Sequence, residues 1–283
     1  MPALTQLKQD IQFNTRLGAL LNVLKSIAAQ QFQVLEERWA SNPAFFEAIQ
    51  TIAGTFHLEG FSHPFTQGGP AGVIAVTSDT GLLGGLNQQV VTMAMREYRK
   101  APGELIIIGK RGLAYVQEYR VSCKEFPGIQ DDKRRELADE VRNYVLERVL
   151  QGTLGSVVVV YPRAMSFTLQ RVEAIQALPC QGWLQSGTTA RGVRGGAVLM
   201  ESSVGRILEY LVLAWLGEKL YEVFGSSRLS EVAARSVHLE GSSQELQRRR
   251  NKLLRRYFRE RHEVIDRSMR ELFAAKAIFG GSS

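Results

Sequence analysis

The chain has 283 residues, of which 45% are hydrophobic and 22% charged, so it is long enough to bury the core of one or two domains. No apolar run approaches the roughly 20 residues that a membrane-spanning helix needs. The formal charge is +7, and between Arg228 and Lys276 there are 13 basic residues against 7 acidic ones. Most of the positive excess therefore lies near the C-terminus, where it favours an acidic partner.

Apolar residues recur with helical spacing over residues 4–39 and again over residues 44–55. Asn42-Pro43 lies between the two stretches and predicts a break, because proline lacks an amide donor and restricts the residue before it. We therefore assign residues 1–58 to an N-terminal coiled-coil helix.

The pattern changes after residues 60–70, a loop rich in glycine and proline. Strands alternate with helices from there on, which indicates an α/β layer with a mostly parallel sheet. This α/β base domain is assigned to residues 70–180, and Asp131-Asp132 are predicted to cap its last helix. The predicted strands cover 73–76, 105–108, 121–126, 157–161 and 167–177, and the predicted helices cover 86–99, 111–118 and 131–150.

Residues 181–200 contain many Gly, Ser and Thr and predict a flexible loop, and residues 201–283 form the C-terminal coiled-coil helix. Apolar and small residues recur there in alternating steps of three and four, which is the seam of a helix packed against another helix. The seam consists of Leu229, Val232, Ser236, Leu239, Ser243, Leu246, Arg250, Leu253 and Tyr257. The predicted fold is thus an α/β domain with a mostly parallel sheet, inserted between long N- and C-terminal helices that pair as an antiparallel coiled coil.

A glycine-rich segment, Thr77 to Asn87, lies between a predicted strand and a predicted helix. Such a turn can bind phosphate at a helix N-terminus, but the spacing matches neither the G-x-x-x-x-G-K-[ST] nor the G-x-G-x-x-G pattern. We favour a tight structural turn. Its residues are Asp79, Gly81, Gly84 and Gly85, with Asp79 capping the turn that follows it.

The sequence offers no pattern for catalysis or metal binding. His57 and His63 flank a loop without a third ligand, while His238 and His262 lie in the C-terminal helix. No nucleophile elbow or paired-carboxylate cluster can be argued. We expect no catalytic site, no metal and no cofactor on this chain.

Basic side chains are concentrated in one run of the C-terminal helix. Like charges three or four residues apart on a helix repel one another, so this density favours an acidic partner over a merely solvated face. Nucleic acid is the alternative, although few aromatic residues for base stacking accompany the run. The run consists of Arg248, Arg249, Arg250, Lys252, Arg255, Arg256, Arg259 and Arg261.

Several motifs resemble those of the gamma subunit of F-type ATP synthases, the central rotor stalk. Residues 77–87 match the pattern T-S-D-x-G-L-x-G-G-L-N, and residues 230–235 resemble the S-E-x-A-A-R start of that family's C-terminal helix. Residues 108–112 and the Arg259-x-Arg261 segment are also similar. Thr80 and Leu83 stand where the family usually has Arg and Cys, and residues 236–241 and 262–268 depart from it too, which predicts a divergent or alternative bacterial lineage.

This resemblance implies a rotor rather than an enzyme. The paired helices would turn inside a hexamer of alpha and beta subunits, with the basic run from Arg248 to Arg261 contacting that collar. The α/β domain would lie near the epsilon subunit and the membrane c-ring, at the cytoplasmic face of the bacterial plasma membrane. Two alternatives remain open: a nucleotide-binding α/β enzyme that uses the turn at Gly81–Gly85, and a basic coiled-coil protein that binds nucleic acid.

Overall fold

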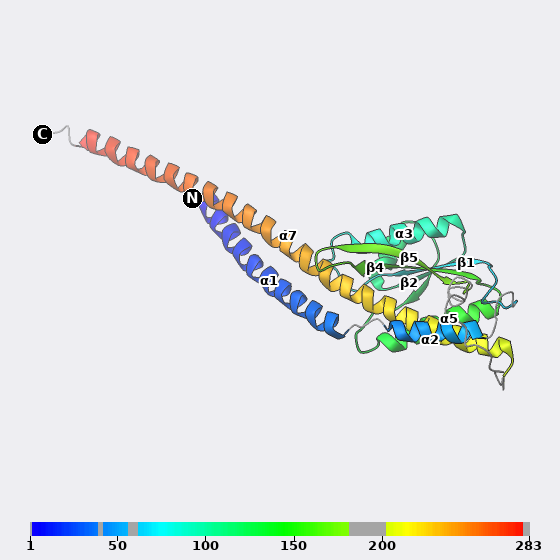
Figure 1. Cartoon of the computed structure of the whole chain (residues 1–283). Coiled ribbons are helices and arrows are strands. Elements are labelled where there is room, and N and C mark those ends of the chain that lie inside the picture. Colours follow the sequence, from blue (N-terminus) through cyan, green and yellow to red (C-terminus); the bar gives the residue numbers. More distant parts are fainter. Residues whose placement is uncertain (1, 39–41, 56–61, 181–201, 280–283) are drawn as a thin grey trace. The chain divides into compact units, whose positions relative to one another are not determined.

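The computed structural model describes residues 2–38, 42–55, 62–180 and 202–279, and the predicted flexible loop at 181–200 lies outside them. The chain divides into two compact units, and Figure 1 labels its helices and strands. Met1–Ala28 and Ser236–Ser283 form one, which we call the helical unit, and Ala29–Arg235 form the other, the α/β unit.

The helices among the described residues follow the predicted ranges closely. They are α1 (Pro2–Arg38), α2 (Pro43–Thr55), α3 (Leu86–Lys100), α4 (Lys110–Gln117), α5 (Arg134–Leu150) and α7 (Val204–Phe279). Asn42 lies just before α2, and its side-chain Oδ1 accepts a hydrogen bond from the amide of Phe45 at 3.2 Å. The break at Asn42-Pro43 thus coincides with a capped helix start.

Five strands form one sheet in the order β3-β2-β1-β4-β5. They are β1 (Ala71–Val76), β2 (Glu104–Ile108), β3 (Lys124–Phe126), β4 (Ser156–Ala164) and β5 (Gln170–Leu178). The first four strands in this order run parallel, and β5 pairs antiparallel with β4. The prediction of a mostly parallel sheet is confirmed. The third strand is shorter than predicted, because residues 121–123 lie outside the pairing with β2.

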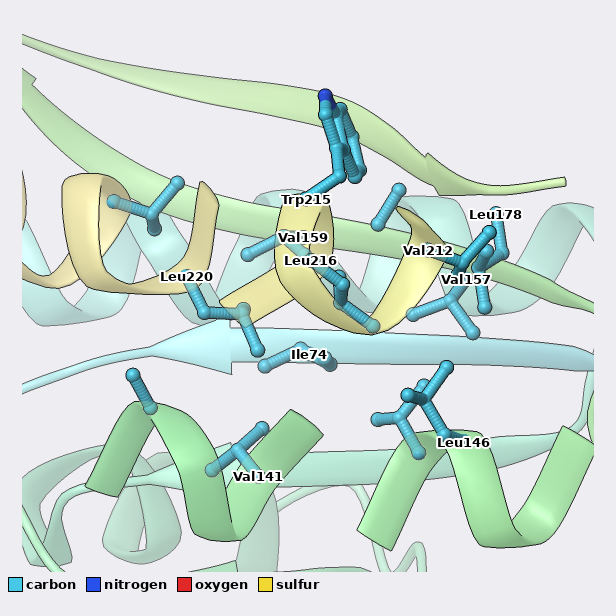
Figure 2. Close-up of a cluster of buried hydrophobic side chains, with 14 of the residues drawn as sticks. Ile74, Val141, Leu146, Val157, Val159, Leu178, Val212, Trp215, Leu216 and Leu220 are labelled. Atoms are coloured by element: carbon cyan, nitrogen blue, oxygen red, sulfur yellow. The ribbon is translucent and has the colours of Figure 1, made fainter. Parts of the chain in front are cut away.

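Both faces of the sheet are covered, since alternate residues of the central strands enter different cores. Ile74 and Val76 of β1 pack into one core with residues of α2, α5 and the first part of α7. Val73 and Ala75 pack into the other core, against α3 and α4. Figure 2 shows the first core, in which Val141 of α5 and Leu216 of α7 lie near Ile74. This double coverage explains the continuous apolar runs of β1 and β2.

The predicted capping role of Asp131-Asp132 is wrong. The residue before α5 is Lys133, and no side-chain hydrogen bond caps this end. The carboxylate of Asp131 instead accepts a bond from Nε of Arg228 at 3.2 Å. Asp131 therefore bonds to an arginine distant in sequence instead of capping α5.

The packing of α7 in the first core predicts different losses of stability when two of its leucines are truncated. Leu216 is 1% exposed and Leu213 is 39% exposed. We expect Leu216→Ala to lower the free energy of unfolding by about 2–5 kcal/mol, because it removes packed atoms and leaves a cavity. Leu213→Ala, the matched control one turn away, should cost clearly less. Denaturant unfolding of the two variants measures the difference, and equal losses would contradict the burial of Leu216.

Candidate functional site

The helical unit pairs α1 with α7 in an antiparallel arrangement. Nζ of Lys25 lies 2.7 Å from a carboxylate oxygen of Glu240. Three residues earlier in α1 and three later in α7, the hydroxyl of Ser243 donates to Oδ1 of Asn22 at 3.0 Å. The contacts thus move toward the start of α1 as they move toward the end of α7. The predicted antiparallel pairing of the terminal helices is confirmed.

The predicted seam of α7 is turned away from solvent along its whole length. Leu229, Val232, Ser236 and Leu239 are at most 6% exposed. The remaining seam residues, from Ser243 to Tyr257, are half-buried. Burial therefore decreases along the helix toward the C-terminus, while the three-and-four spacing stays in place.

Polar residues occupy part of this seam. Asn14 of α1 is 6% exposed, and its side-chain amide donates to the backbone oxygen of Asp10 at 2.7 Å. Asn14 and Arg250 line one cavity of about 290 Å³ between the two helices, together with Ser243. Nε of Arg250 is buried without a hydrogen-bond partner among the described residues. Polar seam residues fix the register of paired helices at a cost in stability, so this part of the pair is specified rather than tightly packed.

The eight basic residues predicted to contact a partner do not all face the same way. Arg250 is half-buried in the seam, and the other seven, from Arg248 to Arg261, are exposed. Two of the exposed arginines pair with glutamates of their own helix: Arg256 with Glu260 at 2.8 Å and Arg248 with Glu245 at 3.7 Å. Seven of the eight are therefore accessible to a partner, and contact with one stays a prediction.

The glycine-rich turn after β1 is held by polar contacts within the protein. The hydroxyl of Thr77 donates to the carbonyl of Ile108 at 2.6 Å and accepts from the amide of Gly112 at 3.0 Å. The side-chain amide of Asn87 donates to the hydroxyl of Ser78 at 2.8 Å. These bonds join the turn to β2, to α4 and to the start of α3.

Asp79 connects the same turn to two further segments. Its Oδ1 accepts from the backbone amide of Lys110 at 2.9 Å, and its Oδ2 accepts from that of Gly128 at 3.2 Å. Its described bonds thus reach the N-terminus of α4 and the loop after β3, rather than the turn that follows it as the sequence predicts. A carboxylate at a helix N-terminus is electrostatically favourable, which explains the choice of α4.

The three glycines of the turn differ in backbone conformation and in surroundings. Gly84 has a φ of +60°, in the left-handed region that favours glycine. Gly81 lies against the guanidinium of Arg111, and Gly85 precedes α3 with an ordinary φ of −92°. Only Gly84 among them needs glycine for its backbone conformation.

Among the described residues no cluster of three His, Cys, Asp or Glu side chains could hold a metal ion. No helix in the described ranges combines the length and apolarity needed to cross a membrane.

Comparison with known proteins identifies the family. A family model described as ATP synthase matches residues 3–277. The ATP synthase gamma chain of Clostridium beijerinckii is 24% identical over 284 residues, which cover 97% of each chain. That of Symbiobacterium thermophilum is 28% identical over 228 residues, which cover 79% of this chain and 77% of the relative. The chain belongs to this ATP synthase family.

Solved structures share the fold. A chain of the mitochondrial ATP synthase of Euglena gracilis, in a structure of its OSCP, F1 and c-ring, is 16% identical with a TM-score of 0.69. The match covers 100% of this chain and 97% of that one. A chain from the central stalk and c-ring of the Tetrahymena thermophila mitochondrial enzyme has a TM-score of 0.56 at 18% identity, covering 79% and 99%. The fold of an inserted α/β unit with paired terminal helices is therefore that of these chains.

The contacts of Thr77 predict a strict requirement at Gly112. A Cβ atom there would overlap the Thr77 hydroxyl, whereas a Cβ at Gly241, in the exposed part of α7, meets nothing within 4 Å. We expect Gly112→Ala to destabilise the chain by about 1–3 kcal/mol. Gly241→Ala should stabilise its helix by up to about 1 kcal/mol, since alanine is the better helix former. Thermal unfolding of both variants tests the contrast, and two changes of the same sign would contradict it.

The cross-helix pair of Lys25 and Glu240 predicts acid sensitivity of the helical unit. The hydrogen bond from Lys25, followed by one from Gln244, lowers the pKa of Glu240. The stabilising contribution is therefore present above the ordinary glutamate pKa and is lost as the pH falls through the lowered value. Wild-type chain should lose more stability on acidification than Glu240→Gln or Lys25→Met, measured by melting at neutral and acidic pH. Identical acid sensitivity in all three chains would refute this.

Proposed function

We propose that the chain is the central rotor stalk of a rotary F-type ATP synthase, in a divergent bacterial form. The observation that carries the proposal is the match of residues 3–277 to the ATP synthase family, combined with an antiparallel pair of terminal helices bearing exposed basic residues. Identities of 22–28% to bacterial gamma chains agree with the departures from the family pattern. The proposed organisation is an N-terminal helical segment at 1–58, a base domain at 70–180 and a C-terminal helical segment at 201–283.

The surface of the helical unit supports enclosure by other subunits. Phe13, Leu20 and Ile27 are spaced seven residues apart on α1 and are 46–65% exposed. Ile265 and Met269 of α7 are each 47% exposed, one turn apart. Exposed apolar stripes on both paired helices support an interaction surface there. A surrounding protein collar with acidic groups would cover both the apolar stripes and the basic residues.

The proposed mechanism requires the paired helices to act as a stiff, asymmetric shaft. As the paired helices turn inside a hexamer of alpha and beta subunits, they would press each beta subunit into a different nucleotide state. The α/β unit would attach to the epsilon subunit and the c-ring, placing the chain peripherally at the cytoplasmic face of the plasma membrane. Catalysis then belongs to the hexamer, and this chain needs no cofactor or catalytic site of its own.

The two alternatives lack a supporting observation. In the glycine-rich turn, the described hydrogen bonds of Thr77, Ser78 and Asp79 go to other protein groups. The basic run has one adjacent aromatic pair, Tyr257 and Phe258. Equilibrium binding of ATP, or salt-dependent binding of DNA, to the isolated chain would favour one of these alternatives over the rotor.

We predict that the exposed arginines near the C-terminal end of α7 act together in coupling. Reversal of Arg255, Arg256, Arg259 and Arg261 to Glu should weaken the coupling of ATP hydrolysis to ion pumping in the assembled enzyme, because the acidic collar would then meet like charge. The matched control changes the same four residues to Lys and keeps the charge. Single neutralisations should have little effect, since exposed ion pairs contribute roughly 0–1 kcal/mol. Unchanged ATP-driven pumping after the fourfold reversal would contradict collar contact by this run.

A further inference from the structure

Within the α/β unit, one short segment of α7 carries polar side chains into the domain. Arg228, Ser230, Glu231 and Arg235 occupy two turns of the helix, and we call them the α7 joint. Ser230 is completely buried and Glu231 is 4% exposed. Each of the four makes a hydrogen bond or ion pair, and three of them reach other segments of the chain.

The first contact reaches the sheet. The hydroxyl of Ser230 donates to the carbonyl oxygen of Pro162 at 3.1 Å, and Pro162 belongs to β4. This bond is between groups buried in the protein, where a hydroxyl without a partner would cost free energy. It therefore specifies which side of α7 faces β4.

The second contact reaches the loop before α5. Arg228 donates from Nη1 to Glu231 at 2.9 Å and from Nε to Asp131 at 3.2 Å. Burial, the largest influence, raises the pKa of Glu231, and the neighbouring Arg228 opposes that rise. Burial alone would lower the pKa of Arg228, but Glu231 and Asp131 together raise it. The arginine is therefore held charged between two carboxyl groups of different segments.

The third contact reaches the glycine-rich turn. Nη2 of Arg235 donates to the hydroxyl of Thr80 at 2.6 Å. The joint thus attaches α7 to three separate parts of the α/β unit: strand β4, the loop before α5 and the turn after β1. Arg228 and Arg235 lie two turns apart on one face of α7 and Ser230 lies on another face, so the three attachments together oppose rotation of the helix about its own axis.

A helix that is packed by apolar residues alone makes no directional contacts. The hydrophobic effect is non-directional, so apolar burial alone does not single out one rotational setting of a helix. Hydrogen bonds weaken steeply as their angles depart from linearity. The largely buried pair of Arg228 and Glu231 lies within α7 and holds the guanidinium in place. The bonds to Asp131 and Thr80, at exposed positions, add direction rather than much stability.

We infer that the α7 joint fixes the rotational setting of α7 in the α/β unit and so transmits torque between that unit and the paired helices. The inference rests on the proposed rotor function. Residues of the joint are positioning residues, because they act by holding the helix. Loss of the joint should let α7 twist relative to the α/β unit under load, so that part of the rotation of the paired helices is not passed on.

The test uses the whole enzyme, assembled with its alpha, beta and membrane subunits in vesicles. ATP hydrolysis and ATP-driven ion uptake are measured in the same sample, the latter with a membrane-potential dye that responds to any coupling cation. The test chain carries Arg228→Met, Glu231→Gln and Arg235→Met. We expect several-fold less uptake for each ATP hydrolysed, with hydrolysis and subunit composition retained.

Arg206→Met is the matched control, since Arg206 is an exposed arginine of α7 in the same unit. It should leave the ratio of uptake to hydrolysis unchanged. Arg228→Lys, which keeps the charge, should recover part of the ratio. Thr80→Val changes an exposed residue and removes only the acceptor for Arg235. This variant replaces the triple variant if the triple variant fails to fold. It should lower the ratio of uptake to hydrolysis to a smaller degree.

The outcomes distinguish an error in the proposed function from an error in the role of the α7 joint. If wild-type chain does not restore ATP-driven uptake with the other subunits, the proposed function is wrong. If wild-type chain restores it and both the triple variant and Thr80→Val keep the normal ratio, only the joint is wrong. If the triple variant loses hydrolysis and uptake in parallel, with less assembled enzyme, Thr80→Val decides the question: a normal ratio for this variant would assign the joint a purely structural role and overturn the inference.

Discussion

Burial of the first part of α7 beneath the sheet is the contact on which the other features depend. Leu208, Val212, Leu216 and Leu220 are at most 1% exposed and belong to the same core as Ile74 of the central strand. Figure 2 shows the last three of these side chains beside Ile74. The same continuous helix then supplies the seam of the helical unit. A helix that is fixed in a core at one end and paired along its other part can carry a mechanical load between the two. Without the buried part, the exposed basic residues would belong to an unanchored helix.

The sequence revealed the elements whose burial is periodic. Leu229, Val232 and Leu239 repeat at the spacing of one helix face, and they are buried because that face meets other elements. Apolar runs such as Ile106–Ile108 likewise report a strand covered on both faces. These regularities are local, so the order of elements, the mostly parallel sheet and the paired terminal helices could be predicted.

Polar partners could not be predicted in the same way. Asp131 and Asp79 both look like local caps in sequence, yet their bonds reach Arg228 and the amide of Lys110. Arg235 bonds to Thr80, which lies 155 residues away in the chain. A hydrogen bond involves one pair of residues and leaves no periodic pattern. Sequence adjacency also grouped Arg250 with the exposed arginines, although its place in the seam turns it inward.

Polar contacts occur at positions where they can fix the angle and register of the helices. Apolar packing supplies cohesion but sets angle and register loosely, while buried polar contacts contribute little net stability and exclude other arrangements. In the helical unit, the exposed bond between Ser243 and Asn22 joins one pair of positions across the two helices, and Arg250 turns into the same seam. In the α/β unit, Ser230 and Arg228 select one rotational setting of α7. Torque changes angle and register before it changes burial. Polar contacts are therefore the ones that oppose slippage, although apolar residues form both cores of the α/β unit.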